Sequence, residues 1–340
     1  MKFGSIPVQQ AEGKLFAHNI AGPNGRNAFR KGKPITAGDI DKLEQMGLRS
    51  VYAVELEPGD IDENSAARYI AEAVMGGGLH IQGGSAGRVN LTALHSGLLQ
   101  VDQERLDLVN QCEGVTVATL HTRSLVKPGQ NTATVKIIPY AIPAQALEQA
   151  LLAARGATPV IQVKAFNPRK VSVIYSGSES ARERIIRSYR PALTKRVNEL
   201  GSDVAAETYI PLQGENDAET LARTFCEQIK QGIEVFLVAS ETSTMDPNDI
   251  IPSAVGIAGG QVACVGAPIE PGNLVMLAYI DDAASGASAA LLNVPGCVRS
   301  PAPTMIDKIL AALLAGERLS RSDIIRMGHG GLVEGARHGA

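Results

Sequence analysis

The sequence VSVIYSGSES, at positions 171–180, decides the fold of the C-terminal half of the chain. Its first five residues are mostly apolar or β-branched, which is typical of a buried strand. A small polar segment, Ser176–Glu179, follows, and a stretch with helical spacing then runs to Gly201. A strand, a polar loop and a helix in this order predict the first unit of a parallel sheet.

The same order continues downstream. Further strands are predicted at residues 203–210, 235–238, 261–265, 274–279 and 289–294, and a last helix is predicted to begin at Pro301. Asn216 with Glu219 three residues later resembles a capping box at the start of one intervening helix. Strands that alternate with helices predict an α/β fold, with a doubly wound, mostly parallel sheet in the C-terminal domain.

The N-terminal half has a different pattern. Thr36 and Asp39 resemble a capping box whose helix ends at Gly47, and short β-branched runs bounded by Gly, Pro or Asn predict several strands. We therefore expect smaller mixed α+β domains before the α/β domain. The expected limits are 1–78 for an N-terminal α+β region, 79–167 for a mixed β-rich domain, 168–318 for the α/β domain and 319–340 for a partly disordered tail.

Composition excludes several classes of function. The net charge of −3 gives no basic footprint for nucleic acid, so we expect no nucleic-acid partner. No window approaches the roughly 20 apolar residues of a membrane span, and the first residues lack the apolar core of a signal peptide. These features predict a cytoplasmic protein. The four cysteines are far apart, which favours reduced thiols over a zinc site.

Ligands of open parallel sheets bind at the carboxyl ends of the strands, so three loops are candidates for the site. The substrate-binding candidates are small, hydroxyl-bearing or charged residues of these loops: Ser176, Gly177, Ser178, Glu179, Ser240, Glu241, Thr242, Ser243, Pro295, Gly296, Arg299 and Ser300. Asp249 is the catalytic candidate, and Asp246 and Asp249 are candidate Mg²⁺ ligands, because carboxylates suit this ion. The alternative for Asp249 is an ordinary helix cap.

The third loop offers the clearest local chemistry. Ser300 is a good helix cap, Pro301 suits a first helical position, and Gly296 allows a sharp turn before them. Together with Arg299, such a helix start would attract an anion. An ordinary capped helix with a surface arginine is the alternative.

Residues 83–87, GGSAG, match the G-x-S-x-G pattern of hydrolases. That pattern needs a strand before it and a helix after it, whereas Arg88–Leu94 has the composition of a strand. A serine hydrolase is therefore disfavoured. Neither a G-x-G-x-x-G motif nor a P-loop occurs, which argues against those two nucleotide sites.

The order of these loops resembles the molybdopterin-binding domain of molybdopterin adenylyltransferases and molybdenumtransferases. Ser176–Glu179 stands where that family has Thr-Gly-Asp-Glu, and Leu237–Asp249 stands where it has an apolar strand, Ser-Gly-Gly-x-Ser-x-Gly and an acid. Glu270–Asn273 resembles Lys-Pro-Gly-Lys, and Val294–Ser300 resembles Leu-Pro-Gly-Asn-Pro-x-Ser. Residues 1–75 resemble the N-terminal region of the molybdenumtransferase branch, and the stretch 129–139 is consistent with a longer subgroup sometimes joined to a cytidylyltransferase-type domain.

The chain also departs from the family pattern. Glu241 and Thr242 replace the Gly-Gly pair, Glu270 and Asn273 replace both lysines, and the Met-Asp-Gly-Tyr-Ala signature is missing. The order of motifs supports the fold, while these changes leave catalysis open.

The resemblance implies a protein of molybdenum-cofactor biosynthesis or handling that binds molybdopterin, a phosphorylated pterin. It could be a nucleotidyl- or molybdenum-transferase with Mg²⁺ and ATP, a non-catalytic cofactor-binding or regulatory relative, or, as a third hypothesis, an unrelated α/β hydrolase. Implied partners are a molybdenum-cofactor cytidylyltransferase or a molybdoenzyme, and a homodimer or higher homo-oligomer is expected.

Overall fold

The structure is a computed structural model that describes residues 1–282 and 286–333. Its contacts divide the chain into two units, Met1–Lys164 and Ala165–Ala340. This division is coarser than the one expected from the sequence, whose limits at residues 78, 167 and 318 stay predictions. Among the described residues, no helix is long and apolar enough to cross a membrane.

The second unit is built on a six-stranded sheet. Its strands, in spatial order, are β16 (Asp203–Pro211), β15 (Lys170–Gly177), β17 (Val235–Ser240), β20 (Ala287–Asn293), β19 (Met276–Asp282) and β18 (Gln261–Val265). The first four are parallel, and β19 is antiparallel to both of its neighbours. The connection from β19 to β20 is too short for a crossover, which is why this edge is antiparallel.

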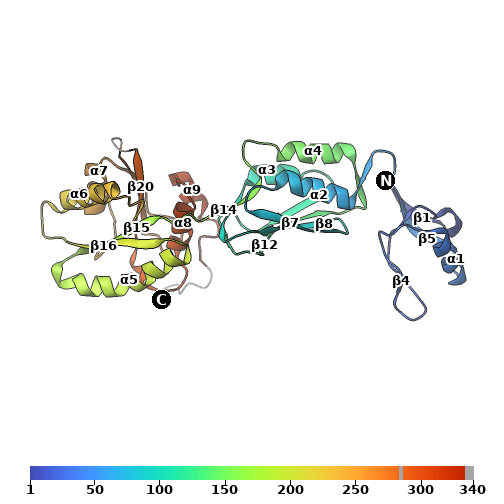
Figure 1. The fold of residues 1–340 in the computed structure, drawn as a ribbon, viewed down its shortest axis with the longest axis horizontal. Helices are drawn as coiled ribbons and strands as arrows, with labels where there is room; N and C mark the ends of the chain where they lie inside the picture. Colours follow the sequence, from blue (N-terminus) through green and yellow to red (C-terminus); the bar gives the residue numbers. More distant parts are fainter. Residues whose placement is uncertain (283–285, 334–340) are drawn as a thin grey trace. The chain divides into compact units, whose positions relative to one another are not determined.

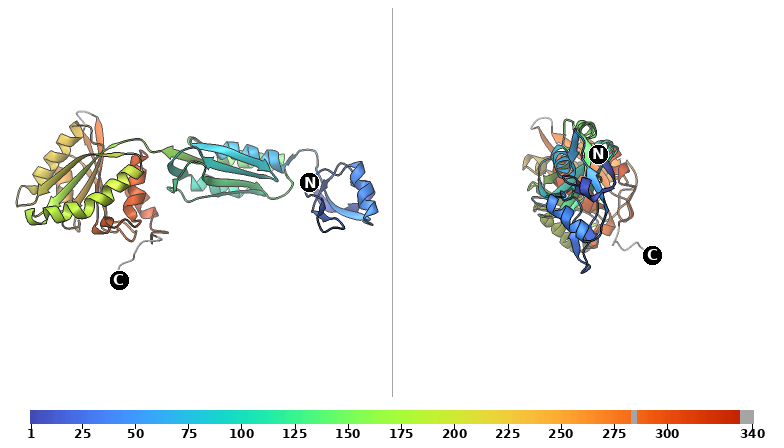
Figure 2. Two further views of the ribbon diagram at one scale, coloured as in Figure 1. Left: turned by 60° about the horizontal axis from the view of Figure 1, so that its bottom comes forward. Right: turned by 90° about the vertical axis from the view of Figure 1, so that its right-hand side faces the viewer.

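Helices cover both faces of this sheet (Figures 1 and 2). They are α5 (Arg182–Glu199), α6 (Asp217–Lys230), α7 (Ile250–Ile257) and α8 (Met305–Leu314). Alternate strand residues such as Ile174, Phe236 and Leu291 pack with α6 and α7 in one core. In Figure 1, α5 lies on the opposite face from α6 and α7. The prediction of a doubly wound, mostly parallel sheet is confirmed.

The predicted start of the last helix is wrong. Residues Gly296–Arg299 form a short 3-10 helix, and α8 begins only at Met305, where Thr304 and Asp307 form a capping box. The residue before a proline is disfavoured in the α-helical region, so Pro303 keeps Ala302 out of a helix that would start at Pro301. Ser300 therefore follows the 3-10 helix as its C-terminal cap and starts no α-helix.

The predicted capping box at Asn216 is also wrong. Asn216 makes no side-chain cap hydrogen bond. The next residue, Asp217, instead accepts hydrogen bonds from the N–H groups of Gln213 and Gly214. The carboxylate thus closes the turn before α6 rather than the first turn of the helix.

The expected tail contains ordered structure in the part that is described. A further helix, α9 (Arg321–Arg326), begins at Ser320, whose side chain forms a capping box with Asp323. Beyond it, Glu270 exchanges backbone hydrogen bonds with Gly331 and Val333. The remainder of the expected disorder falls at 334–340, outside the described residues.

The first unit begins with a small β-rich segment. A three-stranded sheet has the order β1 (Lys2–Pro7), β5 (Ser50–Glu55) and β2 (Leu15–Phe16), and β3 (Ile20–Ala21) pairs with β4 (Asn27–Phe29). A 3-10 turn (Val8–Gln10) follows β1, and α1 (Ala37–Gln45) begins with the predicted capping box of Thr36 and Asp39. Phe16 and Phe29 stack in its core.

The rest of this unit is a second mixed α+β arrangement, as predicted. A four-stranded sheet has the order β10 (Val115–Thr119), β12 (Asn131–Ile137), β8 (Arg88–Ala93) and β7 (Leu79–Ser85). A three-stranded sheet has the order β11 (Leu125–Val126), β9 (Gly97–Val101) and β14 (Ile161–Ala165), and β13 (Ala141–Pro143) pairs with β6 (Asp60–Asp62). The helices are α2 (Glu63–Val74), α3 (Gln103–Asn110) and α4 (Ala144–Ala154).

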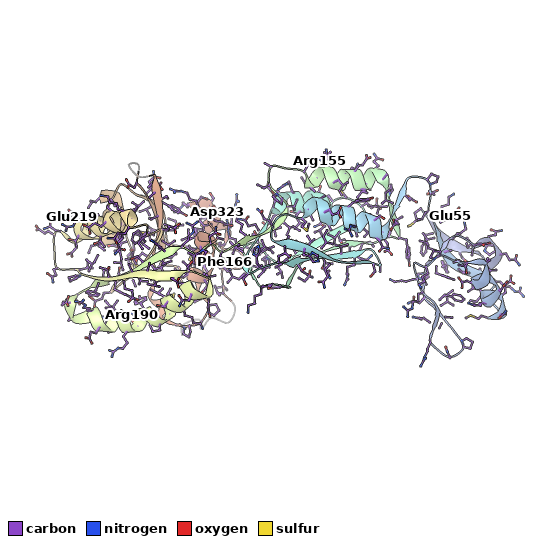
Figure 3. The ribbon with its side chains drawn as sticks, in the orientation of Figure 1. Glu55, Arg155, Phe166, Arg190, Glu219 and Asp323 are labelled. Atoms are coloured by element: carbon purple, nitrogen blue, oxygen red, sulfur yellow. The ribbon has the colours of Figure 1, made fainter. Side chains whose placement is uncertain are left out.

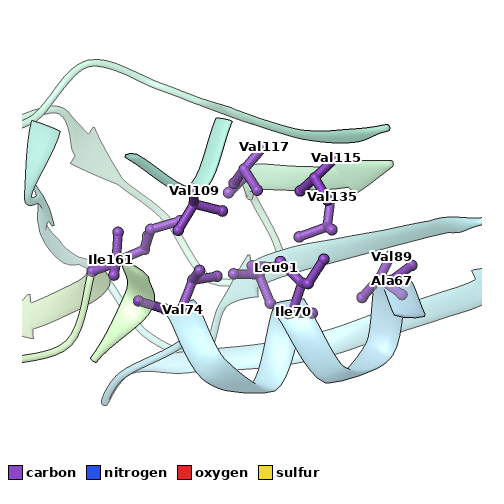
Figure 4. Packing of buried hydrophobic residues seen from close by; sticks show 14 of the residues in the cluster. Ala67, Ile70, Val74, Val89, Leu91, Val109, Val115, Val117, Val135 and Ile161 are labelled. Carbon is purple, nitrogen blue, oxygen red and sulfur yellow. The ribbon is translucent and has the colours of Figure 1, made fainter. Parts of the chain in front are cut away.

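Figure 4 shows the core of this arrangement, in which Ile70 and Val74 of α2 pack against Val89 and Leu91 of β8. The GGSAG segment at 83–87 closes the antiparallel hairpin of β7 and β8. A strand, not a helix, follows this serine, so it does not lie on a nucleophile elbow.

Candidate functional site

The three candidate loops follow β15, β17 and β20, which are neighbours in the sheet. In the register of the parallel strands Ser176 lies opposite Ser240, and Val238 lies opposite Asn293. The carboxyl ends of these strands therefore meet at one edge of the sheet, as the sequence predicts.

Two buried serines join the first two loops. The hydroxyl oxygens of Ser176 and Ser240 are 2.9 Å apart, and the backbone N–H of Glu241 donates to the carbonyl oxygen of Ser176 at 2.8 Å. Because both side chains are buried, this pair holds the loops together and forms the floor of the site.

The carboxylate of Glu241 reaches across from the second loop to the first. Its Oε2 accepts hydrogen bonds from the backbone N–H of Ser178 at 2.8 Å and from the Ser178 hydroxyl at 2.9 Å. Its Oε1 accepts from Nη2 of Arg184 at 2.8 Å. The hydrogen bonds from Ser178, with the charge of Arg184, hold the pKa of the Glu241 carboxyl below its ordinary value.

Gly177 allows this close approach. A Cβ atom at Gly177 would lie 2.8 Å from the Cβ of Glu241, too close for any other residue without movement. Next to it, the exposed Glu179 pairs with Arg182 at 3.1 Å. The hydroxyl of Tyr209, on the neighbouring strand β16, donates to the carbonyl oxygen of Ser178 at 2.5 Å and so fixes the first loop.

The rest of the second loop contains exposed and buried hydroxyls. Thr242 is exposed and Ser243 is half-buried, whereas Thr244 is buried. The side-chain Nδ2 of Asn293, at the end of β20, donates to the Thr244 hydroxyl at 2.5 Å, and the buried Oδ1 of Asn293 has no partner among the described residues. Sequence reasoning missed Asn293, and its only signal was an amide ending an apolar strand.

Asp249 and Asp246 hold the loop itself. Oδ2 of Asp249 accepts from the N–H groups of Met245 at 2.7 Å and Asp246 at 3.1 Å, and Asp249 makes no cap hydrogen bond into α7. Oδ1 of Asp246 accepts from the backbone and side-chain nitrogens of Asn248. The predicted cap is therefore absent, and the acid closes the turn before the helix instead.

These carboxylates do not form a prepared metal site. Across residues 1–282 and 286–333, no three His, Cys, Asp or Glu side chains are grouped so that they could hold a metal ion. One oxygen of each acid, Oδ2 of Asp249 and Oδ1 of Asp246, already accepts from nitrogen donors of its own loop, and a Mg²⁺ role of the two acids stays a prediction.

The third loop presents Arg299 at its surface. Nε of Arg299 donates to the carbonyl oxygen of Gly296 at 2.8 Å, and the guanidinium lies 5.5 Å from the centre of the Tyr189 ring. Pro295 precedes this turn, and the hydroxyl of Ser300 accepts from the N–H of Ala302 at 3.2 Å. The guanidinium keeps further N–H groups with which it could bind an oxyanion.

Arg196 of α5 holds the third loop from inside, and sequence reasoning missed it. Its side chain, 6% exposed, pairs with Asp307 at 2.9 Å and donates to the carbonyl oxygens of four residues. These are Ala192, Val298, Ser300 and Ala302. No local signal distinguishes this arginine from its exposed neighbours on α5.

A family model described as a domain of unknown function (DUF8806) matches residues 5–55. No curated protein matches the chain.

Solved structures that are similar to the chain include the following two, both at low TM-scores. A molybdenum cofactor biosynthesis protein from Pyrococcus furiosus is 11% identical with a TM-score of 0.24, over 94% of this chain and 66% of that chain. The molybdopterin biosynthesis moeA protein from Pyrococcus horikoshii OT3 is 10% identical with a TM-score of 0.28, over 96% of this chain and 75% of that chain. Similarities at these TM-scores carry no argument, and the fold class rests on the observed order of strands and helices.

Proposed function

We propose that this chain binds a phosphorylated pterin of the molybdopterin type at the carboxyl edge of its parallel strands, and that it acts in molybdenum-cofactor biosynthesis or handling. One observation carries the proposal. Two distant motifs of the family pattern are in direct contact at this edge: Ser176 bonds Ser240, and Ser178 bonds Glu241. Hydroxyls, backbone N–H groups and a guanidinium suit the polar edge and the phosphate of such a ligand.

Between the two forms of this function, the contacts favour a non-catalytic cofactor-binding or regulatory protein over a transferase. The carboxylate of Asp249 is used by two N–H groups of its own loop, and Glu241 extends a negative charge into the edge where the family has glycine. Turnover of ATP with molybdopterin and Mg²⁺ would instead support a nucleotidyl- or molybdenum-transferase. A cytidylyltransferase or molybdoenzyme partner and a homo-oligomer belong to the same proposal.

The phosphate is proposed to bind at residues 295–300. The guanidinium of Arg299 lies in the space that a Cβ atom on Gly296 would take, and it can offer a planar pair of donors to phosphate oxygens. Since Glu270 and Asn273 replace the family's lysines, Arg299 would supply most of the positive charge there.

Calorimetry with a stable phosphorylated pterin tests this proposal. Arg299→Ala should weaken binding about 10- to 100-fold, because a charge-assisted hydrogen bond contributes ~1.5–3 kcal/mol. Arg299→Lys should recover only part of the affinity, because an ammonium lacks the planar fork.

Arg318 supplies the matched control. It also lies over a tyrosine ring, that of Tyr279 at 4.1 Å, but it pairs with Asp281 at the opposite edge of the sheet. Arg318→Ala should leave pterin affinity unchanged. Equal binding by folded Arg299→Ala and the wild type would place the phosphate elsewhere, and no binding by the wild-type protein would refute the proposed function.

A further inference from the structure

The Glu241 carboxylate lies among donors that would suit a free anion equally well. A backbone N–H and a hydroxyl, both from Ser178, and the guanidinium of Arg184 all point at its two oxygens within 2.9 Å. Charge-assisted hydrogen bonds from backbone N–H and arginine are the usual means by which proteins hold phosphate and sulfate. We call these three donor groups the Ser178–Arg184 cradle.

The cradle is held by groups other than Glu241. The Tyr209 hydroxyl fixes the carbonyl of Ser178, and Ser178 follows directly on β15. Gly177 leaves a space that the side chain of Glu241 fills, since a Cβ atom on this glycine would lie only 2.9 Å from Oε2 of Glu241. These anchors would remain in place if the carboxylate moved away.

The side chain of Glu241 can rotate away from the cradle while its backbone stays in place. Its N–H is bonded to the Ser176 carbonyl, in continuation of the pairing of β15 with β17. The side chain of Glu241 is 30% exposed, and that of Arg184 is 59% exposed. Rotation of the Glu241 side chain toward solvent would therefore open the cradle without breaking the sheet.

We propose that the Ser178–Arg184 cradle is an oxyanion site, for inorganic phosphate, sulfate or a phosphate monoester, and that Glu241 is its internal competitor. An external oxyanion binds when the carboxylate swings out, so the wild-type protein binds oxyanions weakly and exchanges them readily. This site is separate from the Arg299 loop. It shares Ser178 and Glu241 with the edge proposed to bind pterin, but its binding of a small anion does not require a pterin.

The occupancy of the cradle by Glu241 sets how far the affinity for an external anion is weakened. If Glu241 fills the cradle for about 90–99% of the time, the apparent dissociation constant of an external anion is raised about 10- to 100-fold over its intrinsic value. Glu241→Ala should therefore bind inorganic phosphate at least about 10-fold more tightly than the wild type. Calorimetry or phosphorus-31 NMR titration of the full chain with inorganic phosphate at neutral pH measures this gain.

Two further variants test whether the gain in phosphate affinity arises at the cradle. The double variant Glu241→Ala with Arg184→Ala should lose most of it, because the guanidinium is one of the three donors. Glu207→Ala is the matched control, because Glu207 pairs with Arg190 of the same helix at 2.5 Å. Glu207→Ala would free Arg190, labelled in Figure 3, and the Tyr175 hydroxyl, whereas no backbone N–H of the described residues donates to this carboxylate.

The expected result is a gain in Glu241→Ala alone. Equal phosphate affinity in Glu241→Ala and the wild type would overturn the proposal, as would an equal gain in Glu207→Ala or a gain that survives removal of Arg184. Thermal melts in phosphate-free buffer check folding, and Glu241→Gln, which keeps the side-chain volume, is titrated in parallel. A phosphate gain without pterin binding would support the cradle and refute only the proposed function.

Discussion

The loops after β17 and β20 lie at the same edge of the sheet but are held in opposite ways. The loop after β20 is fixed from inside, by the buried Arg196 and its hydrogen bonds to loop carbonyls. The loop after β17 is held from inside only by the hydrogen bond of Asn293 to the buried Thr244, among the contacts of the described residues, and otherwise by the solvent-accessible carboxylates of Asp249, Asp246 and Glu241 on backbone N–H groups.

This difference suggests that the loop after β20 contributes to stability, whereas the loop after β17 can exchange contacts with a ligand. A buried arginine that satisfies four carbonyls cannot be withdrawn without leaving polar groups unpaired in the interior. A solvent-accessible carboxylate can exchange its partners for water or for a ligand at little cost. The loop after β17 is therefore the part of the edge that can change, and the loop after β20 is its rigid support.

The largest expected effect is the loss of the internal support. Arg196→Ala should lower the free energy of unfolding by about 3–5 kcal/mol, because it leaves Oδ1 of Asp307 and the carbonyls of Val298, Ser300 and Ala302 without their donor. Chemical denaturation monitored by circular dichroism measures the change.

Two variants on the same helix sharpen this result. Arg196→Lys should recover only part of the loss, because an ammonium has three donors where the guanidinium has five. Arg187→Ala, on the exposed face of α5, should change stability by about 0.5 kcal/mol or less. A loss in Arg196→Ala no greater than in Arg187→Ala would show that the third loop does not depend on this arginine.

The contrast between the two loops also explains what the sequence could predict. The strand at 171–175, the apolar strand beginning at Val235 and the helix start at Thr36 follow from local patterns, and the structure confirms them. Ser300 and Pro301 also have the local pattern of a helix start. There the prediction failed because Pro303 and the distant Arg196 favour an extended backbone.

The contacts of the site depend on residues far apart in the chain. The sequence shows that Glu241 replaces a glycine of the family pattern, but Ser178, which binds its carboxylate, lies 63 positions away. Asn293 and Thr244 are 49 positions apart. Such pairs follow from strand order and register, which local patterns do not specify, so the loops could be predicted while their partners could not.

A smaller effect is expected at Asp249. Asp249→Asn should cost about 1 kcal/mol or less, because an amide oxygen can still accept from the N–H groups of Met245 and Asp246 but without the charge. Asp249→Ala should cost more, since both N–H groups lose their acceptor. Pterin affinity with and without Mg²⁺, measured on the same samples, should change little in the asparagine variant. A loss of Mg²⁺-dependent binding in a folded Asp249→Asn protein would instead make this acid a metal ligand.

The smallest effect is a change with pH at Glu241. The pKa of this carboxyl is lowered from 4.5, first by its hydrogen bonds from Ser178, so the folded state binds the proton less readily than the unfolded chain. The contribution of Glu241 to stability is therefore present above pH 4.5 and is lost as the pH falls through the lower, folded-state pKa.

Urea unfolding of the wild type and Glu241→Gln tests this sign. The wild type should be the more stable protein at neutral pH, and the difference should shrink as the solution is acidified, because a protonated Glu241 and a glutamine carry the same charge. Glu183→Gln, on an exposed position of α5, controls for the loss of one negative charge. A difference that stays constant from neutral to acid pH would mean that the carboxylate is not held by Ser178 in solution. The loop after β17 would then lack the exchangeable anchor that distinguishes it from the loop after β20, and the Ser178–Arg184 cradle would have no internal competitor.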